Sequence, residues 1–197
     1  MIFTTTAFAF SNNDGKIVKA GEFKTFADKV GLKFTMPSNY KETYVKETGD
    51  LLYQFAMKGK KADIEVRYSV WDLKPMKEQF EQYQLDTSVV MAIPSVNFIY
   101  IGLIQANVLN MTQGKYSEIV PEIVPYPSEA VQNDFNTDTG GFAFFEFNCN
   151  FGTGYKYGQM IYVHKDDVAD VIITIMFNNL KTFEKYMPEV FGTLTFK

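Results

Sequence analysis

The sequence predicts an α+β fold in which an antiparallel β-sheet is sandwiched by helices on both faces, an α/β/α arrangement. Three observations predict it. The chain has 197 residues, a length that suits one hydrophobic core. Short segments that alternate apolar and polar residues recur along it, with turn residues between them. Near the C-terminus, Phe142 and Phe144 point to one face of a strand and Phe145 and Phe147 to the other. A sheet that is apolar on both faces needs helices on both.

Residues 1–30 are expected to form an N-terminal arm ahead of one domain that spans residues 31–197. Residues 2–9 end in the small-residue pattern Ala7-x-Ala9, and a polar run follows, as at the end of a secretory signal. The basic region of a signal is missing, however, and the apolar stretch is short. The segment is therefore either a truncated signal peptide or a first β-strand with a polar turn. Localisation stays open between the cytoplasm and export.

Four alternating segments then predict an antiparallel meander. They are separated by turn residues, among them Gly49-Asp50 and the basic run at residues 58–61. The four strands are expected at residues 32–36, 40–48, 51–57 and 64–70.

Helices are predicted after the meander. Apolar residues at positions 73, 76, 80 and 83 have helical spacing, and Pro75 suits the first turn of that helix. Residues 95–110 are apolar on nearly every face, which favours a buried helix. The β-branched and aromatic residues within 96–109 also suit a strand, and periodicity does not decide between the two.

The C-terminal part continues the alternation of strands and helices. Residues 120–127 contain three prolines and predict an extended connector. Ser128 then begins a short helix that ends at Phe135, and Asn178 begins a final helix that Pro188 ends. Further strands are expected at residues 141–148, 155–164 and 168–177, with 191–196 packing back on the domain.

The run from Gly31 to Tyr40, GLKFTMPSNY, resembles the opening of the PsbP-like or Mog-type superfamily, which includes many uncharacterised bacterial proteins. Its glycine, alternating strand, proline and aromatic residue match, although Tyr40 stands where tryptophan is frequent. The resemblance covers residues 31–197. It implies a helix-covered antiparallel sheet and a protein that acts by binding a larger partner. No partner-contacting residue of the family matches a position in this chain.

Composition excludes several classes of function. The net charge is −4 and Arg67 is the only arginine, so nucleic acid is not expected as a partner. The single cysteine, Cys149, excludes an internal disulfide or a thiolate metal cluster within one chain. The most apolar stretch, residues 89–104, is interrupted by Pro94 and is shorter than the roughly 20 residues of a membrane-spanning helix. No transmembrane segment is expected.

No catalytic residue is assigned. A thiol-imidazole dyad would need Cys149 beside His164, but a hairpin closing at residues 151–154 separates them by roughly 26 Å at 3.3 Å per residue. Cys149 is expected to be buried and His164 to face solvent in a turn. No Gly-x-Ser-x-Gly elbow is present, so a hydrolase is the least favoured function.

Two candidate sites remain. Asp134, Asn136 and Asp138 place oxygen ligands at alternate positions, which suggests calcium, although the turn glycine and the bidentate glutamate of a calcium loop are missing. The alternative is an ordinary polar loop. Tyr126 and Tyr155, with Tyr157, are candidate partner-binding residues, because tyrosines on loops and strand ends are favoured in interfaces. The alternative for each is packing on its own sheet.

The sequence therefore favours a non-catalytic binding or accessory protein that engages an unknown protein partner. The alternative is a small-ligand or calcium-binding domain of an exported protein. No other cofactor is expected, and the sequence does not indicate the oligomeric state.

Overall fold

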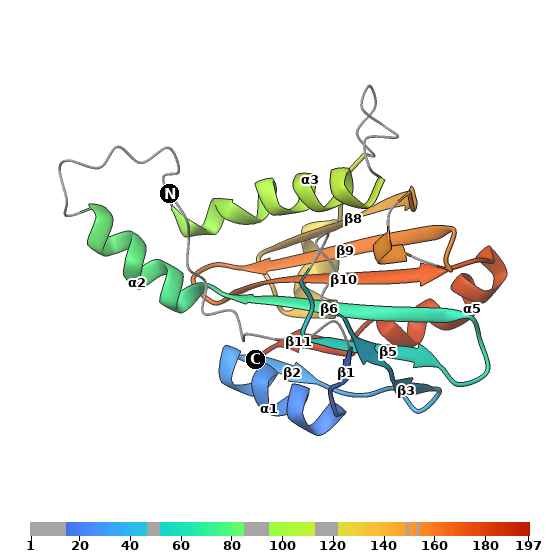
Figure 1. Cartoon of the computed structure of the whole chain (residues 1–197). Helices are drawn as coiled ribbons and strands as arrows, with labels where there is room; N and C mark the ends of the chain where they lie inside the picture. The colour runs from blue at the N-terminus through green and yellow to red at the C-terminus, as the bar shows by residue number, and fades with distance from the viewer. Residues whose placement is uncertain (1–14, 47–51, 85–94, 113–121, 149, 153) are drawn as a thin grey trace.

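A computed structural model describes residues 15–46, 52–84, 95–112, 122–148, 150–152 and 154–197. Within them the protein is α+β, with five α-helices and antiparallel sheets (Figure 1). The helices are α1 (Ala20–Val30), α2 (Leu73–Gln84), α3 (Ile99–Thr112), α4 (Ser128–Phe135) and α5 (Leu180–Val190), and the 3-10 helices are η1 (Val96–Phe98) and η2 (Asn150–Gly152). The strands are β1 (Lys16–Ile17), β2 (Leu32–Phe34), β3 (Tyr40–Glu42), β4 (Tyr44–Val45), β5 (Phe55–Gly59), β6 (Ile64–Asp72), β7 (Val124–Pro125), β8 (Thr139–Glu146), β9 (Tyr157–Lys165), β10 (Ala169–Phe177) and β11 (Leu194–Phe196).

The main sheet has seven strands in the order β3-β5-β6-β10-β9-β8-β7, and every pairing in it is antiparallel. Its three central strands, β6, β10 and β9, are nine residues long and paired along their whole length. The remaining strands form two separate two-stranded antiparallel sheets, β1 with β4 and β11 with β2. The antiparallel meander predicted from the alternating segments is confirmed in part, because β3, β5 and β6 pair in chain order. Residues 32–34 instead form β2, which pairs with β11, and residues 44–45 form β4, which pairs with β1, both outside the main sheet.

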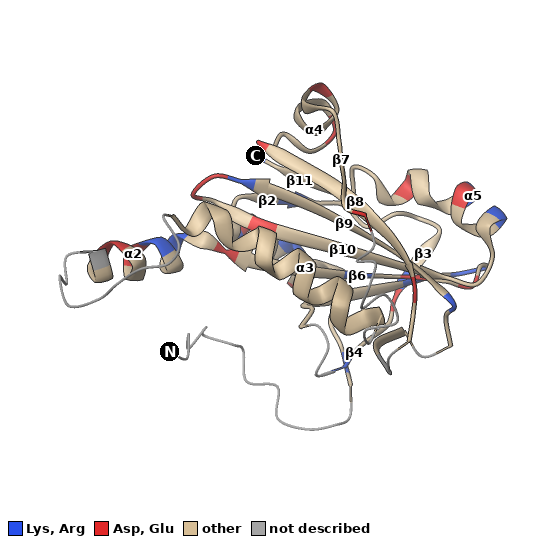
Figure 2. Cartoon of the chain, turned by 90° about the horizontal axis from the view of Figure 1, so that it is seen from above, with Lys and Arg blue, Asp and Glu red and all other residues tan. Residues whose placement is uncertain are grey.

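Side chains alternate between two sides of this sheet. On one side, Tyr100 of α3 stacks on Tyr162 and on His164 of β9, with ring centroids 5.9 and 4.5 Å apart. On the other, Phe183 of α5 stacks on Phe177 of β10 at 4.5 Å. We call these the α3 side and the α5 side. Figure 2 shows α3 crossing the strands on the side seen from above.

An aromatic cluster near α1 forms much of the core on the α5 side. Phe23 of α1 stacks on Phe55 of β5, with centroids 4.8 Å apart and planes 11° apart, and both contact Phe34 and Tyr68. The helix ends at Gly31, whose φ of 87° closes it in the left-handed region that favours glycine. Residues 20–30 of the expected arm are thus a helix whose Phe23 lies in the core. The signal-like residues 1–9 lie outside the described residues.

Two details of the helices depend on the structure. Residues 96–109, for which a strand was an alternative, form η1 and most of α3. The final helix does not end at Pro188 but continues to Val190, so that expectation is wrong. Proline removes one intrahelical donor, and in the last turn this loss does not stop the helix. In the described part of the chain, no helix has the length and apolar character needed to cross a bilayer.

Candidate functional site

Two phenylalanines of β8 form the centre of an aromatic network on the α5 side. Strand alternation points Phe142 and Phe144 to this side, and their rings meet edge to face at 6.2 Å. Phe144 also contacts Phe183 of α5 at 5.3 Å and Phe177 of β10 at 6.2 Å. Despite these contacts, 41% of Phe144 is exposed. A large ring is therefore held in place by its neighbours while it faces solvent.

Two of the predicted tyrosines extend the network. Tyr126, which follows β7, lies 5.3 Å from Phe142 and 6.2 Å from Phe191. Burial, helped by the charge of Asp134, raises the pKa of Tyr126, so its hydroxyl stays protonated. Tyr157 of β9 joins through Phe177, 5.8 Å away. We call the partly exposed rings of this network the aromatic face: Tyr126, Phe142, Phe144, Tyr157 and Phe191.

Two buried polar atoms near the aromatic face lack a hydrogen-bond partner among the described residues. They are the hydroxyl oxygen of Tyr126 and Oε1 of Gln159. Gln159 is 3% exposed and lies directly opposite Phe144, in the pairing of β8 with β9. A buried acceptor without a donor costs about 1–3 kcal/mol. Two buried polar atoms near the aromatic face, one on Tyr126 and one on Gln159, therefore have no hydrogen-bond partner among the described residues.

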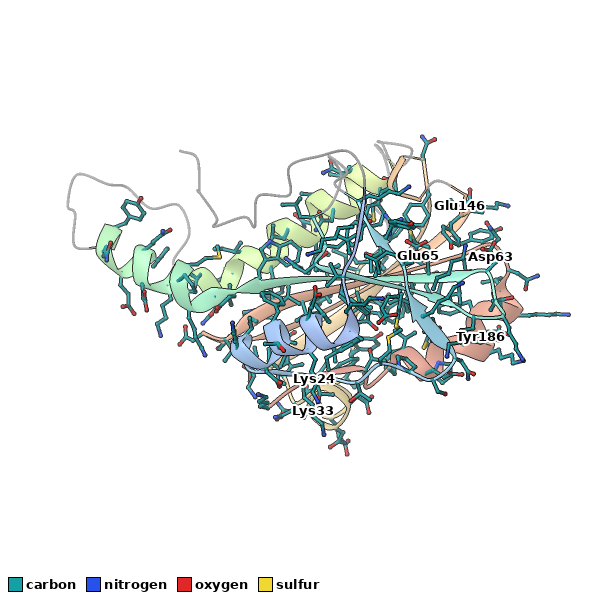
Figure 3. The ribbon with its side chains drawn as sticks, turned by 60° about the horizontal axis from the view of Figure 1, so that its bottom comes forward. Lys24, Lys33, Asp63, Glu65, Glu146 and Tyr186 are labelled. Carbon is teal, nitrogen blue, oxygen red and sulfur yellow. The ribbon has the colours of Figure 1, made fainter. Side chains whose placement is uncertain are left out.

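Tyr155, the third predicted tyrosine, lies elsewhere. Its hydroxyl donates to Oε2 of Glu65 at 3.4 Å, and Glu65 points to the α3 side. Burial and the charge of Glu65 raise the pKa of Tyr155. The ammonium of Lys58 lies 5.6 Å from its ring centroid. Figure 3 shows Glu65 in the half of the molecule that also contains Asp63 and Glu146. The structure therefore brings Tyr126 and Tyr157 into one network and places Tyr155 apart from it.

The single arginine forms a separate cluster on the α3 side. Nε of Arg67 lies 2.7 Å from Oε1 of Glu65, and Nη1 donates to the backbone oxygen of Phe151 at 2.9 Å. The guanidinium lies against two rings, 4.8 Å from the centroid of Tyr53 and 4.3 Å from that of Phe151. Both charged side chains are buried. Nε and Nη1 of Arg67 are both bound within the chain, and we interpret this cluster as structural.

The three calcium candidates lie at the end of α4, which contains Asp134, and in the turn that follows it, which contains Asn136 and Asp138. Asn136 is the left-handed cap of that helix, with φ of 52°, and its side-chain amide donates to the backbone oxygen of Phe196. Oδ2 of Asp138 accepts the backbone N–H of Asp166 at 2.9 Å, while Asp134 is exposed. Among the described residues, no three His, Cys, Asp or Glu side chains gather into a metal-binding group. The calcium hypothesis remains a prediction.

His164 does not face solvent, so that expectation is wrong. Only 2% of it is exposed, because β9 extends to Lys165 and Tyr100 of α3 covers the ring. Its Nδ1 lies 2.5 Å from Oδ1 of Asp170, and its Nε2 lies 2.8 Å from Oδ1 of Asp166. Cys149, the other half of the dyad considered above, lies outside the described residues.

The sequence did not single out Phe144 or Gln159. Alternation assigned Phe144 to a face of its strand, but which part of that face the helices leave open depends on tertiary packing. The unpartnered oxygen of Gln159 has no sequence signal. No known protein family and no curated protein matches the chain.

Proposed function

We propose that this chain is a non-catalytic binding or accessory protein whose aromatic face docks a protein partner. The observation that supports this most is the exposure of Phe144, 41%, at the centre of a network of rings. Aromatic residues are enriched in the energetically dominant parts of interfaces, and rings already held in place lose little entropy on binding. Phe144 is the residue on which the proposal depends.

The chemistry of the aromatic face also limits the partner. Phe144 offers an apolar surface, and Oε1 of Gln159 on the adjacent strand accepts no hydrogen bond from the described residues. A suitable partner presents an apolar side chain to Phe144 and an N–H or O–H donor beside it.

The surroundings of His164 support a non-catalytic protein. Each ring nitrogen lies against a carboxylate, Asp170 at Nδ1 and Asp166 at Nε2. A histidine that activates a nucleophile needs one nitrogen directed at a hydroxyl or thiol. With both nitrogens engaged by carboxylates, His164 serves structure.

The proposal includes the finer description of the fold, an α/β/α sandwich of the PsbP-like type. Contacts of Tyr100 from α3 and of Phe183 from α5 with opposite sides of the sheet support the sandwich. The left-handed conformation of Gly31 and the strand that follows support the resemblance of residues 31–40 to that superfamily. Such a likeness concerns fold more than function.

The test is quantitative affinity capture from the native cell with three forms of the chain. Phe144→Ser removes the centre of the aromatic face. Ile101→Ser is the matched control, because Ile101 is exposed to a similar extent, at 44%, but belongs to α3. We expect a stoichiometric protein that the wild type and the Ile101 variant retain and the Phe144 variant loses. Equal capture by all three forms would contradict the proposal.

A further inference from the structure

His164 connects three elements on the α3 side. It belongs to β9, and its Nδ1 is 2.5 Å from Oδ1 of Asp170 on β10. Its Nε2 is 2.8 Å from Oδ1 of Asp166 in the hairpin between these strands. The ring of Tyr100 lies over the imidazole with centroids 4.5 Å and planes 24° apart, which ties α3 to the same group. The imidazole is therefore one contact between α3 and the end of the hairpin. A second joins η1, just before α3, to the hairpin, where Asn97 and Asp167 exchange hydrogen bonds.

The protonation state of His164 decides whether both carboxylates receive a hydrogen bond from the ring. The imidazolium has two N–H donors, one for each carboxylate, and its charge favours a ring above it. The neutral ring has a single N–H, so one carboxylate then faces a nitrogen lone pair. Asp170 is buried at 2% exposure, and its Oδ2 has no partner among the described residues. That carboxylate has little other compensation for its charge.

The charges around the imidazole agree with this view. Burial alone lowers the pKa of His164, but the hydrogen bonds and charges of Asp170 and Asp166 outweigh burial and raise it. For Asp170, burial raises the pKa and His164 opposes the rise. The two carboxylates act on His164 in the same direction, and both raise the pKa of its imidazole.

Other titratable groups near the ring are already paired or distant from its nitrogens. Asp167 of the hairpin is held by Lys77 of α2 at 2.7 Å, which lowers the pKa of Asp167. Asp138, next to β8, accepts the backbone N–H of Asp166. Lys165 directs its ammonium to the backbone oxygen of Asn136.

The remaining neighbours are uncharged near neutral pH. Burial and the charge of Asp170 raise the pKa of Tyr100, and burial raises that of Tyr162. On β6, the residue opposite Asp170 is Trp71. The protonation of the imidazole therefore depends on His164 and its two carboxylates.

We propose that His164 is a pH-sensitive latch: as the imidazolium it bridges Asp166 and Asp170 and holds Tyr100, and with it α3, on the sheet, and loss of its proton loosens α3. The latch lies on the α3 side, opposite the aromatic face, so it goes beyond the proposed function. A failure of partner capture by the aromatic face leaves it untouched.

The first test follows the imidazole directly. His164 is the only histidine, so its ring C–H signals in an NMR pH titration of the whole chain need no assignment by mutation. We expect a midpoint above 6.5, lowered by about one pH unit or more in Asp166→Asn and Asp170→Asn. Asp166 is largely exposed, so its variant should fold even if the Asp170 variant does not. A midpoint at or below 6.5, or one that Asp166→Asn leaves unchanged, overturns the latch.

The second test follows α3. Hydrogen exchange of the wild type at pH 6 and pH 9, corrected for intrinsic rates, is compared between α3 and α5, which has no contact with His164 among those described. We expect protection of α3 to fall about tenfold at the higher pH relative to α5, the equivalent of one pKa unit. His164→Gln should remove this difference between pH values. Parallel changes in α3 and α5, or an unaltered pH response in His164→Gln, overturn the proposal.

Discussion

The two sides of the central sheet are built from different chemistry, although both are buried. On the α5 side, stacked rings from α1, β5 and α5 meet strands whose inward side chains are mostly aliphatic or aromatic. On the α3 side, the same strands bury six polar or charged residues: Glu65, Arg67, Ser69, His164, Asp170 and Thr174. Burial of apolar surface stabilises with little demand on geometry, whereas buried polar groups stabilise only when their partners are complete. The α5 side should therefore dominate stability, and the α3 side should be sensitive to protonation.

The largest expected effect comes from the apolar side. Phe55→Ala removes a fully buried ring that contacts Phe23, Phe34 and Tyr68, and should lower the free energy of unfolding by about 3–5 kcal/mol. Urea unfolding measures it. Phe26→Ala is the control, because Phe26 contacts Phe23 but is only partly buried. Equal losses in the two variants would contradict the assignment of Phe55 to the centre of the core.

Breaking the buried ion pair on the α3 side should cost nearly as much. Arg67→Met leaves the carboxylate of Glu65 buried without its cation and should cost about 3 kcal/mol. Adding Glu65→Met removes the stranded charge and should recover much of the loss. Urea unfolding of the two single variants and the double variant forms a thermodynamic cycle. A double variant whose loss equals the sum of the single losses would show that the two residues are not coupled.

A smaller effect concerns pH. The pKa of His164 is raised in the folded state. The histidine therefore stabilises the fold, and this contribution is fully present at pH values below the pKa of histidine in the unfolded chain, about 6.5. The contribution is lost as the pH rises from there to the pKa of His164 in the folded protein, because over this range the unfolded chain binds fewer protons than the native one. The slope is at most about 1.4 kcal/mol per pH unit. Urea unfolding at half-unit steps above pH 6.5 measures it, and His164→Gln should flatten the curve. An equal slope in that variant would assign the effect to other groups.

The smallest effect compares one hydroxyl from each side. Oγ1 of Thr174 on the α3 side is buried without a partner among the described residues, so Thr174→Val should be neutral or stabilise by up to about 1 kcal/mol. The hydroxyl of Thr193 pairs with Tyr68 at 2.8 Å on the α5 side, and Thr193→Val should cost about 1–2 kcal/mol. Thermal and urea unfolding give both values. A destabilised Thr174 variant would indicate that its hydroxyl has a partner, such as an ordered water.

Much of this fold follows from the sequence because strand alternation and turn residues are local signals. The strands at β6 and β10 and the bounds of α4 at Ser128 and Phe135 were predicted closely. The final helix was predicted to end too early, because Pro188 lies in a last turn that tolerates the lost donor. The chemical difference between the two sides was not predicted. It depends on which residues of β6 and β10 face each other, which is a property of the register.

The candidate site was predictable only in part, for the same reason. Tyr126 and Tyr157 were chosen as loop and strand-end tyrosines, and tertiary contacts through Phe142 and Phe177 join them. Phe144 is exposed although Phe183 of α5 contacts it, and this partial cover is a tertiary feature. His164 was expected in solvent because it precedes a charged turn, yet Tyr100, 64 residues earlier in the chain, covers it. No local pattern reports such a contact.

The position of Trp71 gives the protein its own optical probe. It is the only tryptophan in the chain and lies across from Asp170, so its indole shares the α3 side with the histidine cluster. Intrinsic fluorescence excited at the red edge of protein absorption therefore reports from this side of the sheet, without a label and at micromolar concentration. The emission of unmodified protein can follow the environment of the hairpin in real time, in any buffer and with any partner that lacks tryptophan.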